Sequence, residues 1–247
     1  MCKLIQINSD PGGNGAVINS VTKKAKTVNN YKILSDCPVS HAKKIAKKLF
    51  EGSRLSHGWE HTQRVARLCE RIGSKEEADL NVLGVAAYLH DIGRCHQDIT
   101  EGKVCHAEKG AQMAAPILQR LALAKKQKEN IIHCLRSHRF RGKIAPKTIE
   151  AKVLFDADKL DAIGAVGVAR AFLFAGEVGA WLHNPDVKVE DSKPYSKDDT
   201  GFREFKVKLC KIKDRILTAE GKKLAQKRHV FMENFFKQFI NEHEGKR

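Results

Sequence analysis

The residues best suited to chemistry are the adjacent pair His90 and Asp91, which end an apolar run over residues 82–89. A run of that composition is typical of a buried segment, where an imidazole and a carboxylate both need a partner. A divalent cation is the simplest partner for both groups. Three distant segments hold further residues of ligand type: His61, His106 and Asp158. The sequence therefore predicts a divalent-metal site.

The elements that must position these residues are predicted to be helices. The chain has 247 residues, of which 42% are hydrophobic and 30% charged, with only six prolines and no repeated β-type alternation. This pattern predicts an all-α fold. We expect a flexible N-terminal arm over residues 1–40, then a single domain over residues 41–247 with a C-terminal helical extension. The ends of apolar helices in such a bundle can meet at one point.

The helix boundaries follow from periodicity and capping patterns. Ser74 and Glu77 resemble a capping box, which predicts that a helix begins there and runs to about residue 90. Pro146 is expected to start the helix that ends near residue 158. The other expected helices cover residues 42–50, 59–72, 107–121, 126–136, 163–177 and 218–242, with a tail over residues 202–217. Four phenylalanines of the last helix are expected in the core or an interface: Phe231, Phe235, Phe236 and Phe239.

The net charge of +16 attracts anions, which are either nucleic acids or phosphate-rich small molecules. The lysines stand mainly at the spacing of solvated helix surfaces. No RNA-binding aromatic motif, zinc finger or helix-turn-helix pattern stands out. A phosphate-rich small molecule is therefore the expected partner, and a nucleic acid is an alternative.

The seven cysteines are an odd number, contain no CxxC pair and follow no apolar leader. We therefore expect reduced thiols and a cytoplasmic protein. The apolar stretch over residues 162–182 contains Arg170, Glu177 and several glycines. Charges at a bilayer centre cost several kilocalories, so we expect a buried core helix here and no membrane partner.

The motifs together resemble the signature of the HD-domain phosphohydrolase superfamily: His61-x-x-Arg-Val, His90-Asp91 and Ala157-Asp158-Lys-Leu. Longer segments are similar to a bacterial and fungal subgroup: SHGWEH (56–61), LHDIGR (89–94), HAEKG (106–110), RSH (136–138) and DADKLDAIG (156–164). The resemblance covers residues 45–245 and implies an all-α HD-domain helical bundle. Members of the subgroup are thought to hydrolyse nucleotides, including deoxynucleoside triphosphates to monophosphate and pyrophosphate. Gly58 is a departure, because the subgroup usually has Asp there.

The resemblance implies that one metal is held by His61, His90, Asp91 and Asp158. Imidazoles mixed with carboxylates suit Mn²⁺, Fe²⁺, Co²⁺, Ni²⁺ or Zn²⁺ better than Mg²⁺ or Ca²⁺. We expect Mn²⁺ first, with the other transition metals and Mg²⁺ as alternatives.

A second metal is a further implication of the resemblance. His106 and His138 match positions that bind a second metal bridged by Asp91 in some HD proteins. The alternative is that these two histidines contact the substrate phosphate. The number of metals per chain, one or two, stays open.

The expected reaction is attack of a metal-bound hydroxide on phosphorus. Cations near the centre stabilise the charge that grows on the phosphate oxygens, and the candidates are Arg94, Lys159 and Lys109. Three residues are expected around the ligands or the substrate: His57, Glu60 as a proton acceptor, and Asp161 as a residue that orients a ligand. Asp161 lies three residues after Asp158, so the two share a helix face.

Two other functions remain open. One is a nucleic-acid-binding HD nuclease, and the other is a non-catalytic sensor of nucleotide or metal. A homodimer through the phenylalanine-rich C-terminal helix is a further alternative.

Overall fold

The computed structural model describes residues 37–51, 58–100, 102–139 and 144–246, and the elements within these ranges are all helices. The all-α prediction is therefore confirmed. Helix α1 (Pro38–Leu49) begins inside the predicted N-terminal arm. The arm prediction was too long by its last three residues, because Pro38 occupies the first helical turn, where its missing N–H costs no hydrogen bond. Residues 1–36 of the arm lie outside the described residues.

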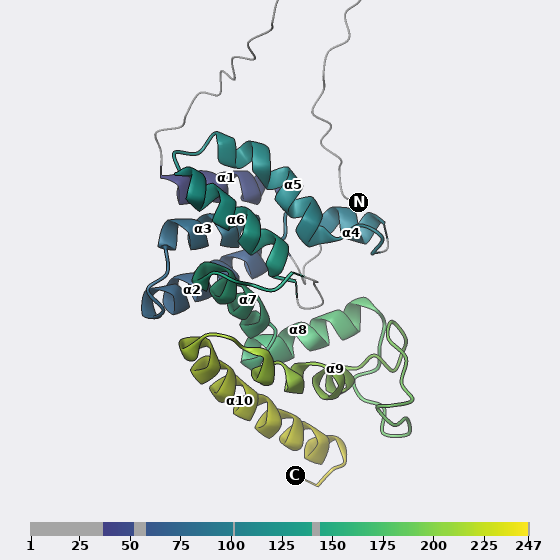
Figure 1. Cartoon of the computed structure of the whole chain (residues 1–247). Coiled ribbons are helices and arrows are strands. Elements are labelled where there is room, and N and C mark those ends of the chain that lie inside the picture. Colours follow the sequence, from purple (N-terminus) through teal and green to yellow (C-terminus); the bar gives the residue numbers. More distant parts are fainter. Residues whose placement is uncertain (1–36, 52–57, 101, 140–143, 247) are drawn as a thin grey trace, which may run out of the picture.

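Helices α1 to α7 form the upper part of the molecule in Figure 1. Helix α2 (Trp59–Lys75) packs against α3 (Leu80–Leu89) and α7 (Ile149–Asp161). Helix α6 (Lys125–Ser137) packs against α3, α7 and α5 (His106–Gln119). The apolar stripe of α2 is buried as its 3.6-residue period predicts: Val65, Leu68, Cys69 and Ile72.

The predicted capping box at Ser74 is wrong. Ser74 lies within α2 and its hydroxyl donates to the carbonyl of Glu70. Asp79 caps α3 instead, because its carboxylate accepts hydrogen bonds from the backbone amides of Asn81 and Val82. Asp is one of the strongest N-cap residues, and its position directly before the apolar run was the available sequence pattern.

Two other predicted boundaries differ from the structure. Helix α7 begins at Ile149 rather than at Pro146, because the Thr148 hydroxyl caps it by accepting from the amide of Ala151. It also continues to Asp161 instead of ending near residue 158. The short helix α4 (Arg94–Ile99) was not predicted, since six residues carry too little periodicity to stand out.

The C-terminal extension forms the lower part of the molecule in Figure 1. Helix α8 (Gly164–Glu177) packs against α9 (Gly201–Val207) and α10 (Ala219–His243), and α10 also packs against α7. The tail predicted over residues 202–217 is α9 followed by two 3-10 turns, Leu209–Lys211 and Lys213–Arg215. No helix among the described residues has the length and apolarity needed to span a membrane.

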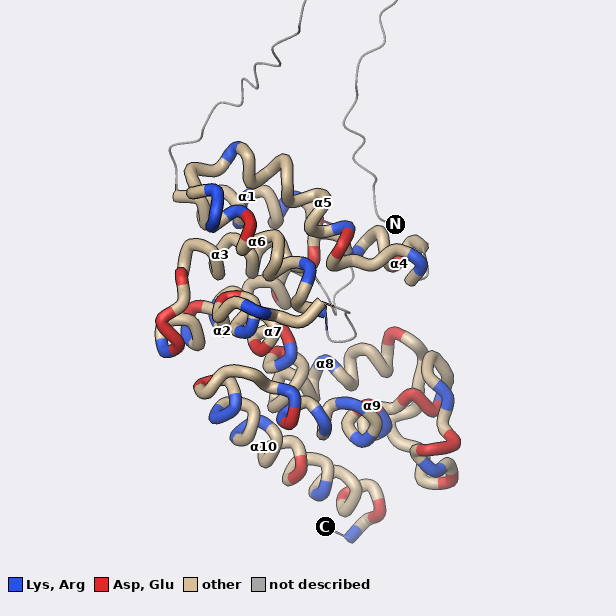
Figure 2. Tube along the Cα trace, viewed as in Figure 1, with Lys and Arg blue, Asp and Glu red and all other residues tan. Residues whose placement is uncertain are grey.

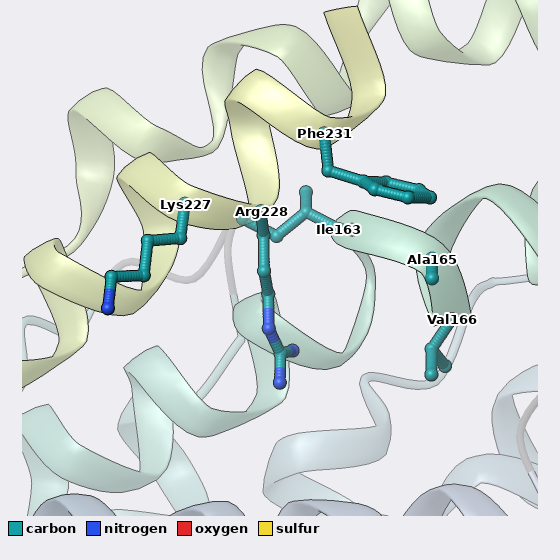
Figure 3. Close-up of a pocket in the computed structure, with 7 residues that line it drawn as sticks. Ile163, Ala165, Val166, Lys227, Arg228 and Phe231 are labelled. Carbon is teal, nitrogen blue, oxygen red and sulfur yellow. The ribbon is translucent and has the colours of Figure 1, made fainter. Parts of the chain in front are cut away.

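Aromatic packing joins the helices of the extension. Phe236 is 1% exposed, and its ring stacks on Phe205 with centroids 4.5 Å apart. Phe231 is 45% exposed and lines a shallow pocket between α8 and α10 (Figure 3). The α10 phenylalanine stripe is therefore partly core, as expected, and partly surface.

Lysine and arginine residues are spread over the helices of both parts (Figure 2). The lysines of α1 are exposed, as expected of a solvated helix face: Lys43, Lys44, Lys47 and Lys48.

Candidate metal centre

Six candidate ligands come together from the ends of five helices. His61 lies in the first turn of α2, and His90 and Asp91 follow the last turn of α3. His106 begins α5, His138 follows α6, and Asp158 lies in the last turn of α7. Five of these residues are at most 4% exposed: His61, His90, Asp91, His106 and His138. Asp158 is 21% exposed at its side chain, which opens the cluster to solvent on one side.

The six residues form two groups with donor atoms close enough to hold an ion. The first group is His61, His90 and Asp158. Nε2 of His61 lies 3.3 Å from Nε2 of His90 and 3.4 Å from Oδ1 of Asp158. Nitrogen and oxygen donors at these separations surround a single point, which suits one transition-metal ion.

The second group is Asp91, His106 and His138. Nε2 of His106 lies 3.1 Å from Nε2 of His138, and both atoms are 3.5 Å from Oδ1 of Asp91. The other oxygen of Asp91, Oδ2, lies 3.9 Å from Nε2 of His61 and 3.8 Å from Nε2 of His90. The carboxylate of Asp91 thus stands between the two groups, with one oxygen toward each.

Every histidine of the cluster has its Nδ1 beside an oxygen acceptor. His61 Nδ1 donates to Oδ2 of Asp161 at 2.7 Å, and His106 Nδ1 donates to Oε1 of Gln97 at 2.8 Å. Two backbone carbonyls accept from the others, each at 2.7 Å: Ala87 from His90 and Leu135 from His138. A neutral imidazole that donates through Nδ1 keeps a lone pair on Nε2.

The donor set therefore fits a divalent cation. Four Nε2 lone pairs face one another in two pairs, which is repulsive unless a positive charge lies between them. The acceptors behind Nδ1 are the kind that fix metal-binding histidines in other proteins. Imidazoles with carboxylates suit a transition metal better than Ca²⁺.

Burial and charge set the ionisation of the cluster. Burial lowers the pKa of His90 to about 4 and that of His106 to about 3. Burial also acts to lower the pKa of His61, but hydrogen bonds to Asp158 and Asp161 outweigh it and raise this pKa. Neutral His90 and His106 carry no proton that a metal would have to displace near pH 7.

The two carboxylates that face the histidines stay ionised. Burial acts to raise the pKa of Asp91 and of Asp158. At Asp91 the charge of Arg94 outweighs burial only together with the neighbouring histidines, and at Asp158 the charge of Lys159 does so together with His61. Both pKa values therefore lie well below the usual range. The cluster thus offers negative charge and neutral nitrogens together.

Two of the three predicted phosphate-stabilising cations lie against these carboxylates. Nη2 of Arg94 is 3.1 Å from Oδ2 of Asp91. Nζ of Lys159 is 2.8 Å from Oδ2 of Asp158 and 2.5 Å from the carbonyl of His138, and the side chain is 5% exposed. These contacts favour a role for Lys159 in holding the ligands.

The remaining predicted residues lie farther from the cluster or outside the described residues. Lys109 is half-buried on α5, near His96, where its charge and burial together lower the pKa of that histidine. The side chain of Glu60 is 87% exposed and pairs with Arg64 at 3.9 Å. His57 lies outside the described residues.

Gly93 allows α4 and α5 to approach closely. A Cβ at this position would lie 2.4 Å from the carbonyl oxygen of His106 and 2.5 Å from the amide of Gly110. No other residue fits so near a neighbouring backbone. The glycine of the LHDIGR segment thus lets His106 reach Asp91.

Three residues that orient ligand histidines were not predicted from the sequence. Arg64 and Arg170 contact Asp161, which in turn accepts a hydrogen bond from His61, and Gln97 contacts His106 directly. Arg64 was within reach, because it lies three residues after His61 on one face of α2 and belongs to the HD motif. Gln97 and Arg170 had no such pattern.

The first aspartate of the DADKLD segment, Asp156, does not face the histidines but contacts the residues before α10. Asp156 accepts from the amides of Leu217 and Thr218 at 2.9 and 2.7 Å, and from the Thr218 hydroxyl at 2.6 Å. It thereby fixes the start of α10. Asp158 faces the histidines, and Asp161 lies behind His61.

Comparison with known proteins places this site in a family. The HD domain family model matches residues 58–163. The uncharacterized protein YpgQ of Bacillus subtilis (strain 168) is 36% identical over 193 residues, which are 76% of this chain and 85% of YpgQ.

Solved structures agree with that assignment. The crystal structure of B. subtilis YpgQ in complex with ADP superposes with a TM-score of 0.63 at 30% identity, over 83% of this chain and 94% of that chain. The crystal structure of an HD-superfamily hydrolase from Bacillus thuringiensis gives a TM-score of 0.66 at 27% identity, over 83% of this chain and 96% of that chain. With the matching family model, the clustered histidines and aspartates, and this similarity over most of its length, the chain belongs to the HD-domain superfamily of hydrolases.

Proposed function

We propose that the protein is a metal-dependent phosphohydrolase of small nucleotides, which cleaves nucleoside or deoxynucleoside triphosphates to monophosphate and pyrophosphate. The observation that carries the proposal is the convergence of four Nε2 lone pairs with the carboxylates of Asp91 and Asp158. This donor set suits a divalent cation, and the similar Bacillus thuringiensis protein is an HD-superfamily hydrolase. The ADP bound to YpgQ supports a nucleotide as the ligand class.

The proposed ligands are His61, His90, Asp91 and Asp158 for one ion. His106 and His138, with Asp91 between, form the position for a second ion. When bound, the metal lowers the pKa of a water molecule so that hydroxide is available near neutral pH. We propose Mn²⁺ as the physiological metal, since the centre joins imidazole nitrogens with the carboxylate oxygens of Asp91 and Asp158, which suit Mn²⁺.

The chain's own residues hold this centre in its working state. Asp161 accepts a hydrogen bond from Nδ1 of His61, so Nε2 of His61 stays directed at the ion. Arg94 fixes both oxygens of Asp91. Because its side chain is 22% exposed, it also reaches the solvent side, where its charge attracts a phosphate. We propose that Lys109 contributes weakly to phosphate binding and that His57 supports a ligand or the substrate.

We also propose the domain organisation and the cellular compartment of the protein. A single HD domain over residues 38–247, with α8 to α10 as its C-terminal extension, contains the whole centre. We propose a cytoplasmic setting with reduced thiols, since the seven cysteines are an odd number and contain no CxxC pair.

The test is a product assay on metal-stripped protein. Nucleoside mono-, di- and triphosphates are incubated with Mn²⁺, Mg²⁺, Co²⁺ or Ni²⁺, and phosphate and pyrophosphate are measured separately. The proposal predicts pyrophosphate from triphosphates in the presence of a transition metal and none without it. Phosphate release from monophosphates alone, or no product with any nucleotide, would contradict it.

A further inference from the structure

Asp161 receives hydrogen bonds from three directions. Its Oδ2 accepts from Nδ1 of His61 at 2.7 Å, from Nη1 of Arg170 at 2.8 Å and from Nη2 of Arg64 at 3.1 Å. Its Oδ1 accepts from Nε of Arg64 at 2.7 Å. The carboxylate is 2% exposed, so these partners replace water around it. His61 therefore rests on a carboxylate whose position is set by two guanidinium groups.

The two arginines come from different parts of the molecule. Arg64 lies on α2, one turn after His61. Arg170 lies on α8, and the HD family model ends at residue 163, one residue before α8 begins. One of the two charges that fix the carboxylate behind His61 is thus supplied by the C-terminal extension.

The extension also caps the helix that carries Asp158 and Asp161. Nη1 of Arg170 donates to the carbonyl of Asp161 at 3.3 Å, and Nη1 of Arg228, on α10, donates to the carbonyl of Leu160. These carbonyls belong to the last turn of α7, where a helix has no partners of its own and attracts positive charge. Figure 3 shows Arg228 projecting from α10 beside Ile163.

Gly164, the first residue of α8, leaves room for the side chain of Arg228. It adopts φ +80°, and a Cβ there would lie 2.9 Å from Cγ of Arg228. A side chain would thus be strained and would press on the arginine that caps α7. The turn from α7 to α8 is therefore shaped to bring the extension against Asp161.

We propose that Arg170 is a positioning residue, through which the C-terminal extension holds Asp161 and thereby fixes His61 for metal binding. The inference rests on the proposed metal centre but not on any substrate. Histidine ligands must point Nε2 at the ion within narrow limits, and loss of a partner behind a ligand typically weakens metal binding about 10- to 100-fold. Without Arg170, Oδ2 of Asp161 loses its partner on the α8 side, and the carboxylate behind His61 is held by Arg64 from one side only.

The test is Co²⁺ binding to metal-stripped full-length protein, followed by the visible absorption of the bound ion. Arg170→Met removes the charge and the donors but keeps the length of the side chain. The matched control is Arg203→Met on α9, which breaks a comparably buried ion pair with Asp199 (2.7 Å) in the same extension. Thermal unfolding of both variants measures the cost to the fold.

The proposal predicts that Arg170→Met weakens the tightest Co²⁺ binding about 10- to 100-fold and changes the absorption spectrum, while Arg203→Met binds Co²⁺ like the parent protein. If Arg170→Met does not fold, Arg170→Gln, which keeps a hydrogen-bond donor without the charge, is measured in its place. Parental Co²⁺ affinity and spectrum in the folded Arg170 variant, with any loss confined to thermal stability, would overturn the inference.

The same assay separates this inference from the proposed function. A His61→Ala variant should lose the tight Co²⁺ site. If it does and Arg170→Met weakens binding, the inference stands even where no nucleotide is hydrolysed. If His61→Ala binds Co²⁺ as tightly as the parent, His61 is not a ligand of the tight site, and the inference fails together with the first metal position.

Discussion

Arg94 contacts both carboxylate oxygens of Asp91 with a single nitrogen: its Nη2 lies 3.2 Å from Oδ1 and 3.1 Å from Oδ2. Each of those oxygens faces a different pair of histidines. The guanidinium therefore holds the one carboxylate that the two ligand groups share, and its charge offsets the burial of that carboxylate. Removal of Asp91 should affect both groups at once, while changes on either side should affect one group.

Asp91→Ala is expected to abolish turnover and to remove metal from both positions. The helical fold should remain, because Arg94 is 22% exposed and can turn its charge to solvent. Metal content by elemental analysis, activity and far-UV circular dichroism check the three expectations. Asp199→Ala, which removes a similarly buried aspartate from another ion pair, is the control and should keep its metal. Full activity in Asp91→Ala would refute the assignment.

Gln97→Leu is expected to weaken the second metal position alone. The amide oxygen of Gln97 holds Nδ1 of His106, and its loss frees the imidazole to turn, at a cost of about 10- to 100-fold in affinity. Stepwise Mn²⁺ titration followed by calorimetry resolves the two positions. In Gln127→Leu, which removes an amide that links α6 to Asp79, both binding steps should stay parental. An unchanged second step in Gln97→Leu would argue against His106 as a ligand.

The first two aspartates of DADKLD, Asp156 and Asp158, are expected to respond in opposite ways to substitution. Asp156→Ala leaves the amides of Leu217 and Thr218 without their acceptor, so the free energy of unfolding should fall by about 1–3 kcal/mol or more. Its Co²⁺ affinity should be parental. Asp158→Ala should lose Co²⁺ affinity with a smaller change in stability. Urea unfolding and Co²⁺ titration of both variants provide the comparison, and equal loss of Co²⁺ affinity would contradict it.

Acid should destabilise the metal-free protein through His106 and His90. Their pKa values in the folded protein are about 3 and about 4, because burial disfavours the charged imidazole. In the unfolded chain both groups take up protons near pH 6.5. Between about pH 6.5 and pH 4 the unfolded chain binds more protons, so this part of the stability is complete above pH 6.5 and is lost as pH falls.

A comparison of the parent with His106→Gln isolates one of these groups. His61, whose pKa is raised, acts in the opposite direction but is present in both proteins. Urea midpoints of metal-stripped protein should fall more steeply in the parent than in His106→Gln as pH decreases from about 7 to about 4.5. Identical pH profiles would show that His106 is not held neutral by burial.

The ligand residues could be predicted because each belongs to a local motif. His90 and Asp91 end an apolar helix, and His61, His106 and Asp158 stand in segments that resemble HD motifs. The general helix pattern could also be predicted, since amphipathic stripes such as that of α2 follow from periodicity. The boundaries at Ser74 and Pro146 were wrong because the capping-box pattern and the proline were given more weight than Asp79 and Thr148, whose side chains cap the two helices.

The residues behind the ligands were not predictable from the sequence, with the exceptions of Asp161 and Arg64. Asp161 shares a helix face with Asp158, so its proximity follows from helix geometry. Gln97 lies on a helix too short to show periodicity, and Arg170 reaches Asp161 only because α8 folds back on α7. The apolar surroundings of Arg170 predicted a core helix but gave no indication of its partner.

The most direct test of the metal centre is an anomalous difference map from crystals of the protein grown with Mn²⁺ and measured at the manganese absorption edge. We expect a peak bounded by His61, His90, Asp91 and Asp158, and a second peak at sufficient Mn²⁺ on the side of Asp91 that faces His106 and His138. Crystals of Asp91→Ala should show neither peak. A map without density among these residues, or with manganese bound only elsewhere on the chain, would contradict the account.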